Sequence, residues 1–444
     1  MDESLKSKTA IIYDYGNNIA LAERLSREFG RVNYFKPWKD TAPETLKMVA
    51  GDGLDTIHRV RDFFAPEVMD NTDLFVFPDI YDGDLQRHLI SLGKRVWGSG
   101  MAEQFEYKRE LFANTLKEVG LAVSPYTICI GVTALEKELK EHDDLWIKLN
   151  LRGDGETWHH ENYELSKRKI EALRYQFGAV NEMVRFTVCE TIATSVEAAY
   201  DGFMVTSDNG KPQFSNKGFL GYETKNLAHI LHAIDYNEFP DAVREVNDKF
   251  APKLAKYGFR SAWGTEIKIA DDGKNYFLDA TCRQPEPPGS IVMEQVENLG
   301  EFMYHGAAGE IRDLEIKHAF GVQVMIYSSW SKSNWQPVQI PENLRRWVKL
   351  YNYCFADGSH HVIPKSVNNT YSDGHDQIGA IVALGDSIEE AIDLVKERCN
   401  MIQGFDTENQ VDALQECLRR IQEGEKEGID FNADVPEPAS VSEK

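Results

Sequence analysis

Hydrophobic and polar positions follow regular patterns along the chain, and these patterns predict its helices and strands. Residues 9–13 are an apolar run, a turn with Gly16 follows, and residues 19–25 carry apolar positions at helical spacing. The same alternation continues, with strands expected at 32–35, 74–80 and 95–100 and a helix at 83–92. Strands that alternate with helices at this spacing predict a parallel, doubly wound sheet in residues 1–100.

The pattern changes after residue 100. Residues 101–120 predict one long amphipathic helix, and the strands that follow are joined by turn residues such as those at 271–273. The expected strands are 123–130, 144–150, 183–193, 196–205, 262–270 and 275–280. This favours an α+β block at 101–315 with antiparallel hairpins. A third block at 316–422 ends in a strand and a helix N-capped by Asp386 or Ser387. Residues 423–444 lack apolar periodicity, which predicts a disordered tail.

Length and charge narrow the possible functions. A chain of 444 residues is long enough for several domains. Its 49 basic and 72 acidic residues give a net charge of −23, which would repel a phosphate backbone, so we expect no nucleic-acid partner. No apolar run approaches the roughly 18 residues of a membrane span. The first ten residues lack the apolar segment of a secretory signal, so we expect a cytoplasmic protein with no membrane partner.

The six cysteines are scattered along the chain, with no C-x-x-C pair and no zinc-like spacing. They are expected to be reduced thiols, mostly small core residues. Zinc and redox chemistry are therefore not expected.

One candidate for nucleotide chemistry is a lysine in an apolar strand. Lys148 lies within the expected strand at 144–150, where an ammonium group is costly unless it faces an anion. The loop at 152–157 contains Gly153 and Gly155, and glycine lets backbone amides approach phosphate oxygens. Taken alone, this pattern favours an edge-strand lysine beside a surface turn.

A second candidate is a pair of acids on neighbouring strands. Glu266 and Asp279 lie on strands joined by the turn at 271–273, so in a hairpin their carboxylates would meet and share metal ions. Two exposed acids on a polar strand face remain the alternative. Four residues after Asp279 comes Arg283, a guanidinium that no adjacent residue neutralises.

Taken together and in order, these residues resemble the ATP-grasp superfamily. Over most of the chain they resemble the glycinamide ribonucleotide synthetases, the phosphoribosylamine–glycine ligases. The similar segments are 77–100, 188–205, 222–225 and 378–402. The resemblance implies an ATP-grasp fold of mixed α/β and α+β class. A doubly wound pre-ATP-grasp domain would occupy 1–100, the ATP-grasp domain 101–315 with a lid at about 121–193, and a small α+β domain 316–422.

The resemblance also implies roles for individual residues with ATP and Mg²⁺ or Mn²⁺ as cofactors. The phosphates would be held by three lysines and a glycine loop: Lys108, Lys148, Lys225, Gly153 and Gly155. The nucleoside would be held by Glu190, by backbone groups from Thr191 to Ala193, and by Glu197. The metals would be held by Glu266, Asp279 and Thr281. Arg283 would neutralise an acyl phosphate, which makes Arg283 and Lys148 the expected catalytic residues.

The chain departs from this family at several positions. Asp279 stands where a glutamate is usual and Thr281 where an asparagine is usual, and LRGDGET replaces the family's glycine loop. A glycine-rich stretch is missing, and QPEPPG follows Arg283 in place of the family's sequence. Because the replaced stretches recognise substrate, a relative with a different amine or carboxylate is expected.

The resulting hypothesis is a ligase that joins a small-molecule carboxylate to an amine through an acyl phosphate. Its alternatives are a nucleotide-binding regulator without turnover and an ATP-grasp kinase. Four residues are weaker candidates for substrate contacts, with ordinary packing as the alternative: Trp158, His159, His160 and Tyr222. The resemblance also leaves a homodimer open.

Overall fold

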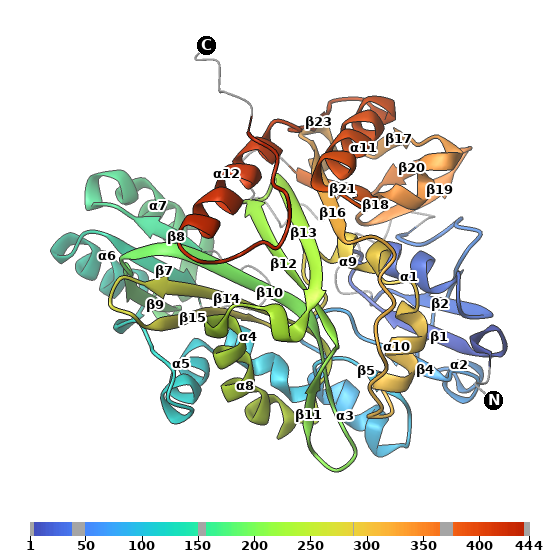
Figure 1. Cartoon of the computed structure of the whole chain (residues 1–444), viewed down its shortest axis with the longest axis horizontal. Coiled ribbons are helices and arrows are strands. Elements are labelled where there is room, and N and C mark those ends of the chain that lie inside the picture. Colours follow the sequence, from blue (N-terminus) through green and yellow to red (C-terminus); the bar gives the residue numbers. More distant parts are fainter. Residues whose placement is uncertain (1–3, 38–48, 150–156, 287, 365–375, 439–444) are drawn as a thin grey trace.

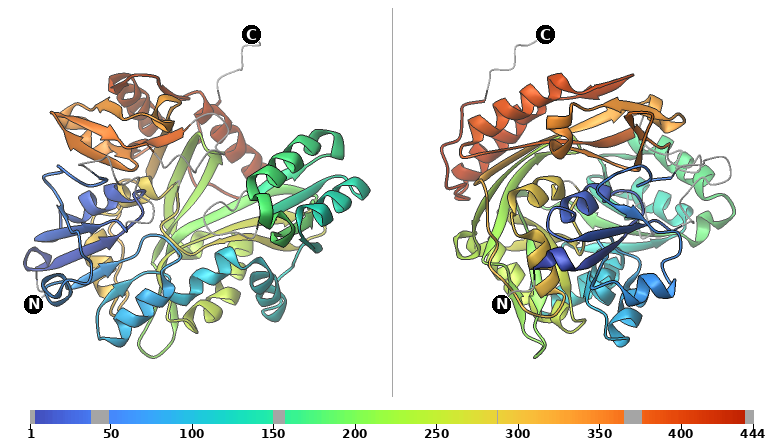
Figure 2. Two further views of the ribbon diagram at one scale, coloured as in Figure 1. Left: turned by 180° about the vertical axis from the view of Figure 1, so that it is seen from behind. Right: turned by 90° about the vertical axis from the view of Figure 1, so that its right-hand side faces the viewer.

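The computed structural model describes residues 4–37, 49–149, 157–286, 288–364 and 376–438. They form a parallel sheet at the amino terminus, a long central sheet and two smaller sheets (Figure 1). The amino-terminal sheet and the sheet of residues 126–190 lie at opposite ends of the central sheet (Figures 1 and 2). Within these residues no helix is both long and apolar enough to span a bilayer.

The amino-terminal sheet has five parallel strands in the order β3-β2-β1-β4-β5. These strands are β1 (Thr9–Tyr13), β2 (Arg31–Phe35), β3 (His58–Arg59), β4 (Leu74–Val76) and β5 (Val96–Trp97). The helices are α1 (Ile19–Leu25), α2 (Pro66–Asp70) and α3 (Gly83–Ser91), after a short 3-10 turn η1 (Leu5–Ser7). The predicted doubly wound sheet is confirmed. In such sheets, ligands bind at the carboxyl ends of strands where the strand order reverses, here between β1 and β4.

The predicted helix at 101–120 is divided in the structure. It consists of η3 (Gly100–Glu103), α4 (Gln104–Tyr107) and α5 (Arg109–Glu118). Lys108 interrupts it with φ −100° and ψ 81°, outside the helical region. The amphipathic pattern survives this break because the buried Phe105, Phe112 and Leu116 still face the same core.

A four-stranded sheet, here called the lid sheet, follows in the order β6-β9-β7-β8. Its strands are β6 (Tyr126–Ile130), β7 (Leu145–Leu149), β8 (Thr157–His160) and β9 (Arg185–Glu190). The helices α6 (Val132–Glu141) and α7 (Tyr163–Phe177), with η4 (Gly178–Met183), complete it. Ile147, Phe186 and Leu135 belong to its separate hydrophobic core. The lid sheet therefore has a hydrophobic core that is distinct from the main core of the molecule.

The central sheet has ten strands, eight of them in the order β15-β14-β10-β12-β13-β16-β21-β18. The strands are β10 (Thr194–Thr206), β11 (Pro212–Phe214), β12 (Lys217–Thr224), β13 (Ala228–Asp235), β14 (Arg260–Ala270), β15 (Asn275–Thr281), β16 (Phe320–Ser328), β18 (Val348–Leu350), β21 (Asp376–Gly385) and β23 (Thr407–Asn409). β13 pairs directly with β16 in antiparallel register. The sheet therefore continues across residue 315, where the sequence predicts a domain boundary.

Helices cover both faces of this sheet and link it to the remaining small sheet. They are η5 (Tyr236–Glu238), α8 (Asp241–Ala255), α9 (Gly289–Gln295), α10 (Leu299–Gly306), α11 (Ile388–Met401) and α12 (Ala413–Lys426). The small sheet has the order β19-β20-β17-β22. It contains β17 (Gln336–Gln339), β19 (Tyr353–Ala356), β20 (Ser359–Val362) and β22 (Gln403–Gly404), with η6 (Trp330–Lys332) and η7 (Glu342–Trp347) beside it.

The structure differs from the predicted disordered tail. Residues 423–426 complete α12, and the chain beyond it packs against the sheet (Figure 1). Ile429 and Phe431 are fully buried, and the Phe431 carbonyl accepts a hydrogen bond from His232 Nδ1 at 2.7 Å. Two apolar side chains among many polar residues leave no periodic signal, but they are enough to hold this segment in place.

Candidate nucleotide and metal site

The two candidate metal acids meet on a hairpin. β14 and β15 are antiparallel, and Glu266 lies directly opposite Asp279. The register shifts after this pair, so that Ile267 pairs with Phe277 and Leu278 is left between the paired positions. Such a bulge redirects side chains and leaves a backbone group available. The hairpin and the meeting of the two acids are as the sequence predicts.

Lys148 reaches this hairpin from the lid sheet. Its Nζ lies 2.5 Å from Asp279 Oδ2 and donates a second bond to the Leu278 carbonyl at 3.2 Å. On β7, buried side chains alternate with partly exposed ones, and Lys148 belongs to the partly exposed set. The alternation therefore directs Lys148 away from the lid core and towards the central sheet.

A second cation on Asp279 was not predicted from the sequence. Arg109, the first residue of α5, forms an ion pair with Asp279 through its Nη1. Desolvation alone would raise the pKa of Asp279, but the charges of Arg109 and Lys148 outweigh it and lower that pKa to about 2. Asp279 is therefore ionised and held between two cations.

The break at Lys108 determines which side chains enter this cluster. Lys108 itself is exposed, and its Nζ donates to Gln104 Oε1 at 2.7 Å. Arg109 follows the break and contacts Asp279, whereas Glu106 precedes it and accepts from Arg283 Nε at 2.8 Å. The expected phosphate lysine at 108 thus lies outside the cluster, and its neighbour Arg109 lies inside it.

Arg283 has acidic partners that are remote in the sequence. Besides Glu106, Asp79 lies beyond the carboxyl end of β4 with its Oδ1 3.4 Å from Arg283 Nη1. The pair with Glu106, together with Asp79, raises the pKa of Arg283 despite its burial. Burial in turn raises the pKa of Asp79, although Arg283 opposes this. The guanidinium that seemed unneutralised in the sequence is neutralised by tertiary contacts.

Several carboxylates crowd around Glu266. The Glu266 side chain is open to solvent, but desolvation by the surrounding protein, followed by the charges of Asp279, Glu197 and Glu223, raises its pKa to about 8. Glu197 comes from β10, and Glu223 from the end of β12. A divalent cation would offset the repulsion among these carboxylates, and carboxylate oxygens are the ligands that Mg²⁺ and Mn²⁺ prefer.

The protein groups are too few to form a complete metal cage. Within the described ranges, no three His, Cys, Asp or Glu side chains are arranged to hold a metal ion by themselves. Mg²⁺ commonly takes one or two carboxylates and fills its remaining positions with water and substrate phosphates. Thr281 lies opposite Gly264 in the hairpin. Asp201 is close to the same position, because a Cβ added to Gly264 would lie 2.9 Å from Asp201 Oδ1.

Comparison with solved structures identifies the fold. Phosphoribosylamine–glycine ligase from Thermotoga maritima is 14% identical, with a TM-score of 0.64 over 90% of this chain and 98% of that one. Biotin carboxylase from Campylobacter jejuni, in a β-γ-ATP complex, is 15% identical, with a TM-score of 0.61 over 96% of this chain and 98% of its own. The biotin carboxylase domain of 2-oxoglutarate carboxylase from Hydrogenobacter thermophilus, with MgADP and bicarbonate, is 13% identical, with a TM-score of 0.60 over 95% of each chain.

This chain has the ATP-grasp fold. The expected fold class, with its amino-terminal parallel sheet and carboxy-terminal α+β part, is confirmed by these comparisons. A scan against protein-family models and a search of curated proteins found no match. This chain therefore shares its fold with proteins that are only 13–15% identical to it in sequence.

In this ATP-grasp fold, the expected adenine-side residues lie where the lid sheet joins the central sheet. The Glu190 amide donates to the Pro125 carbonyl at 3.0 Å, and the Glu190 carbonyl accepts from Ser124 Oγ at 2.9 Å. Thr191 Oγ1 donates to Asp144, and the Ala193 carbonyl accepts from the Asp271 amide at 3.4 Å. These contacts fasten the connection between β9 and β10.

The other candidates lie in different surroundings. Lys225 is exposed in the turn after β12, and its charge contributes to lowering the pKa of Glu223. Gly153 and Gly155 lie outside the described residues. Trp158 is buried in the lid core, and His160 is buried with Ser166 and the His142 carbonyl as partners. Packing explains Trp158 and His160.

Two further weak candidates also have structural partners. His159 stacks on Trp146 and lies 2.7 Å from Asp144. Tyr222 is buried and contacts Phe431 on the opposite face of the sheet from Glu223. Neither residue contacts the Asp279 cluster.

Proposed function

We propose that this protein is a Mg-ATP-dependent ligase that joins a carboxylate to an amine and releases ADP and phosphate. The observation that carries the proposal is the meeting of Lys148 with Asp279, opposite Glu266, in an ATP-grasp fold. By their names, solved structures of this fold include a phosphoribosylamine–glycine ligase and two biotin carboxylases with adenine nucleotides. Their substrates are those proteins' own, and the assay below identifies the carboxylate and the amine of this chain.

The proposed roles follow from charge. Lys148 and Arg109 both form ion pairs with Asp279. When the nucleotide binds, these two cations would leave Asp279 and bind its phosphates instead. Glu266 and Asp279, with Thr281 beside them, would then hold Mg²⁺ or Mn²⁺, which supplies charge neutralisation along the transferring phosphate. Lys108 and Lys225 are proposed as further phosphate contacts that require side-chain movement. Gly153 and Gly155 are proposed to close over the phosphates.

The nucleoside would lie at the connection between β9 and β10. We assign the adenine edge to Glu190 and to backbone groups from Thr191 to Ala193, and the ribose hydroxyls to Glu197. The exposed carboxylates of Glu190 and Glu197 are able to accept hydrogen bonds from such groups.

The proposed reaction has two steps and needs no protein nucleophile. The substrate carboxylate oxygen bonds to the γ-phosphorus as the bond to ADP breaks, which gives an acyl phosphate. The amine nitrogen then bonds to the acyl carbon and phosphate departs. Arg283 would leave Glu106 and Asp79 to neutralise the acyl phosphate. Positioning and charge neutralisation account for most of the catalysis in reactions of this type.

Nucleotide product analysis tests the proposal. Purified protein is incubated with Mg-ATP and a panel of carboxylates crossed with amines, and ATP, ADP and AMP are then separated. ADP that requires both a carboxylate and an amine, together with an amide product, is the expected result. AMP would overturn the acyl-phosphate route, and ADP with a phosphorylated but unjoined product would identify a kinase. ATP binding without turnover across the panel would favour a regulator.

A further inference from the structure

The polar face of the central sheet extends beyond the candidate metal acids. On β13, His229 lies directly opposite Glu223 of β12, and on β16, Gln323 lies directly opposite His229. Residues in register on neighbouring strands point to the same face, and Glu223 also contributes its charge to Glu266. A continuous row of polar side chains therefore leads from the Glu266 region to β16.

The hydrogen bonds of His229 determine its tautomer. Its Nε2 lies 3.1 Å from Glu223 Oε2. Desolvation opposes ionisation of Glu223, but the hydrogen bond from His229 and nearby positive charges lower its pKa, so the group is a carboxylate that only accepts. Nε2 must therefore carry the proton in neutral His229, and Nδ1 presents a lone pair.

That lone pair has no hydrogen-bond partner in the described part of the chain. His229 is 6% exposed, and its Nδ1 is buried without a hydrogen bond. Gln323 is completely buried, and its Oε1 likewise has no hydrogen-bond partner. Buried polar atoms without partners are rare in native proteins. Two such atoms on residues that lie opposite each other on β13 and β16 therefore indicate a place for a polar ligand.

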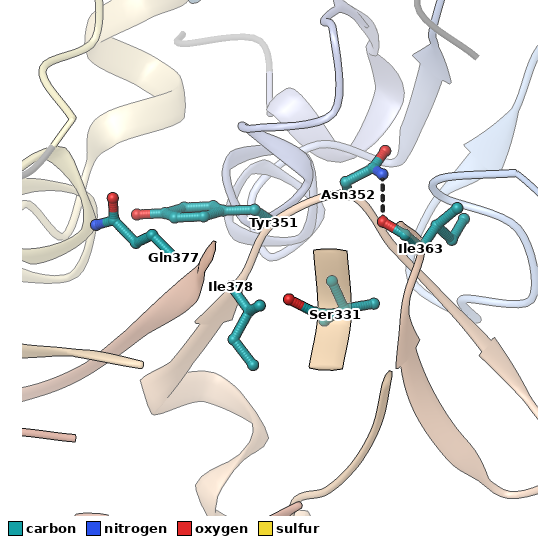
Figure 3. A pocket seen from close by; sticks show the side chains of 7 residues that line it. Ser331, Tyr351, Asn352, Ile363, Gln377 and Ile378 are labelled. Carbon is teal, nitrogen blue, oxygen red and sulfur yellow. Dashed lines mark hydrogen bonds between the residues drawn. The ribbon is translucent and has the colours of Figure 1, made fainter. Parts of the chain in front are cut away.

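A further unpaired group lies in the carboxy-terminal part of the molecule. Gln377 Nε2 is buried without a hydrogen-bond partner, whereas the Tyr351 hydroxyl faces the Glu286 carboxylate, and the Tyr351 ring packs against Met325 of β16. Figure 3 shows the Tyr351 hydroxyl and the Gln377 amide directed towards each other at one side of a small cavity. Met325 lies two residues from Gln323 and hence on the same face.

We propose that His229 accepts the proton that the amine substrate loses when it attacks the acyl phosphate. This rests on the proposed ligase function. The amine nitrogen forms a bond to the acyl carbon, the bond from that carbon to the phosphate oxygen breaks, and phosphate leaves with the bonding electrons. The nitrogen's proton passes to His229 Nδ1, and Glu223 stabilises the resulting imidazolium. Gln323 Oε1 would accept a hydrogen bond from the N–H that remains on this nitrogen.

A test separates the two half-reactions. Acyl phosphate is trapped with hydroxylamine, which is mostly neutral at neutral pH and requires no base, and the hydroxamate is measured beside amide formation with the amine substrate. His229→Gln should keep hydroxamate formation within about threefold of wild type and lose about 100-fold or more of the amide rate, in the range typical of a general base.

The controls use the same strand and the same pair. His232→Gln, three residues along β13, alters a histidine whose Nδ1 already bonds to the Phe431 carbonyl, so the amide step should be unchanged. Glu223→Gln should lower the amide rate by more than the hydroxamate rate, because an amide can donate to Nε2 and so favour the wrong tautomer. The charged groups near His229 are Glu223 on β12, with Lys225 and Arg420 beside that acid, whereas β16 presents the neutral Gln323.

Each outcome is decisive. If His229→Gln keeps both rates, the inference is wrong and the ligase function stands. If a folded His229→Gln loses hydroxamate and amide equally, His229 acts before the amine step, and the inference is again wrong. If wild type forms no hydroxamate with any carboxylate while ATP binds, the ligase proposal fails first, and the role of His229 fails with it.

Discussion

Asp279 is the residue on which the candidate site depends, since Lys148 and Arg109 both pair with it. Lys148→Ala should leave the fold intact, because Arg109 continues to neutralise Asp279. The same change removes a proposed phosphate contact from the lid sheet, so ATP turnover should fall about 100-fold or more. ADP release, measured beside thermal unfolding, checks both expectations.

A matched control for this change is Lys140→Ala. Lys140 is an exposed lysine of the same lid unit, paired with Glu136. Removing it should alter neither turnover nor unfolding measurably. Full activity in Lys148→Ala would rule out the assigned role of Lys148.

For single residues, the sequence predicts a contact only where the two partners are close along the chain. The hairpin acids Glu266 and Asp279 follow from two alternating strands and one turn. Glu106 and Asp79, the partners of Arg283, are 177 and 204 positions away, and no local pattern connects them. The sequence places Arg109 directly after the candidate Lys108, which is a weak signal for its role. Only the break in the helix reveals which of the two side chains enters the cluster.

The division between α4 and α5 gives a prediction at the scale of one element. Because the chain breaks at Lys108, Arg109 reaches Asp279 while Lys108 remains on the surface. Arg109→Ala should therefore weaken ATP binding and turnover more than Lys108→Ala does, by about tenfold or more, as the loss of one charge-assisted contact implies. Nucleotide titration of both variants measures the difference.

The reverse order would contradict this geometry. If Lys108→Ala is the more damaging change, the nucleotide-bound protein must turn Lys108 inward, as the family resemblance implies. Both variants should unfold at the wild-type temperature, since neither side chain contributes to the core.

Elements with strong periodicity could be predicted from the sequence, and interrupted ones could not. The strands expected at 262–270 and 275–280 occur as β14 (Arg260–Ala270) and β15 (Asn275–Thr281). The pattern at 101–120 predicts a continuous helix because the apolar spacing stays helical through the break. The two-residue strand β3 also escapes prediction, because it is too short to show alternation.

Glu294 joins three parts of the molecule. It lies on α9 with its side chain fully buried, and it binds Arg27 after α1, Arg346, and Lys349 of β18 at 2.6–2.7 Å. Desolvation would raise its pKa, but Lys349 and Arg27 outweigh it and lower the pKa far below the ordinary value. A carboxyl with a lowered folded-state pKa stabilises the protein above its unfolded pKa of about 4.3, and this contribution is lost as pH falls.

Glu294→Gln should therefore destabilise the protein by about 3–5 kcal/mol at pH 7, because the buried Lys349 and the partly exposed Arg27 and Arg346 all lose their carboxylate. The difference from wild type should shrink as pH falls below about 4.3. Urea unfolding at several pH values measures it. A difference that stays constant with pH would contradict the electrostatic origin, and Glu118→Gln, at an exposed ion pair, should change nothing.

The carboxy-terminal segment gives a second prediction for the whole molecule. Phe431 is fully buried against Tyr222 and His232, on the face of the sheet that α12 covers. Phe431→Ala should lower the free energy of unfolding by about 3–5 kcal/mol, as the loss of a buried aromatic ring does elsewhere. The exposed Asp434→Ala is the control. Equal stability of both variants in urea would mean that this segment does not hold the fold together.

The pairing of β13 with β16 has a consequence for dividing the chain. A protein cut near residue 315 would leave the unpaired edges of β13 and β16 as apolar strands, which associate readily with other chains. Neither fragment would then be expected to remain monodisperse alone. Produced together, the two fragments should recombine by strand addition and restore the nucleotide site, so this protein is suited to fragment complementation rather than to domain-by-domain expression.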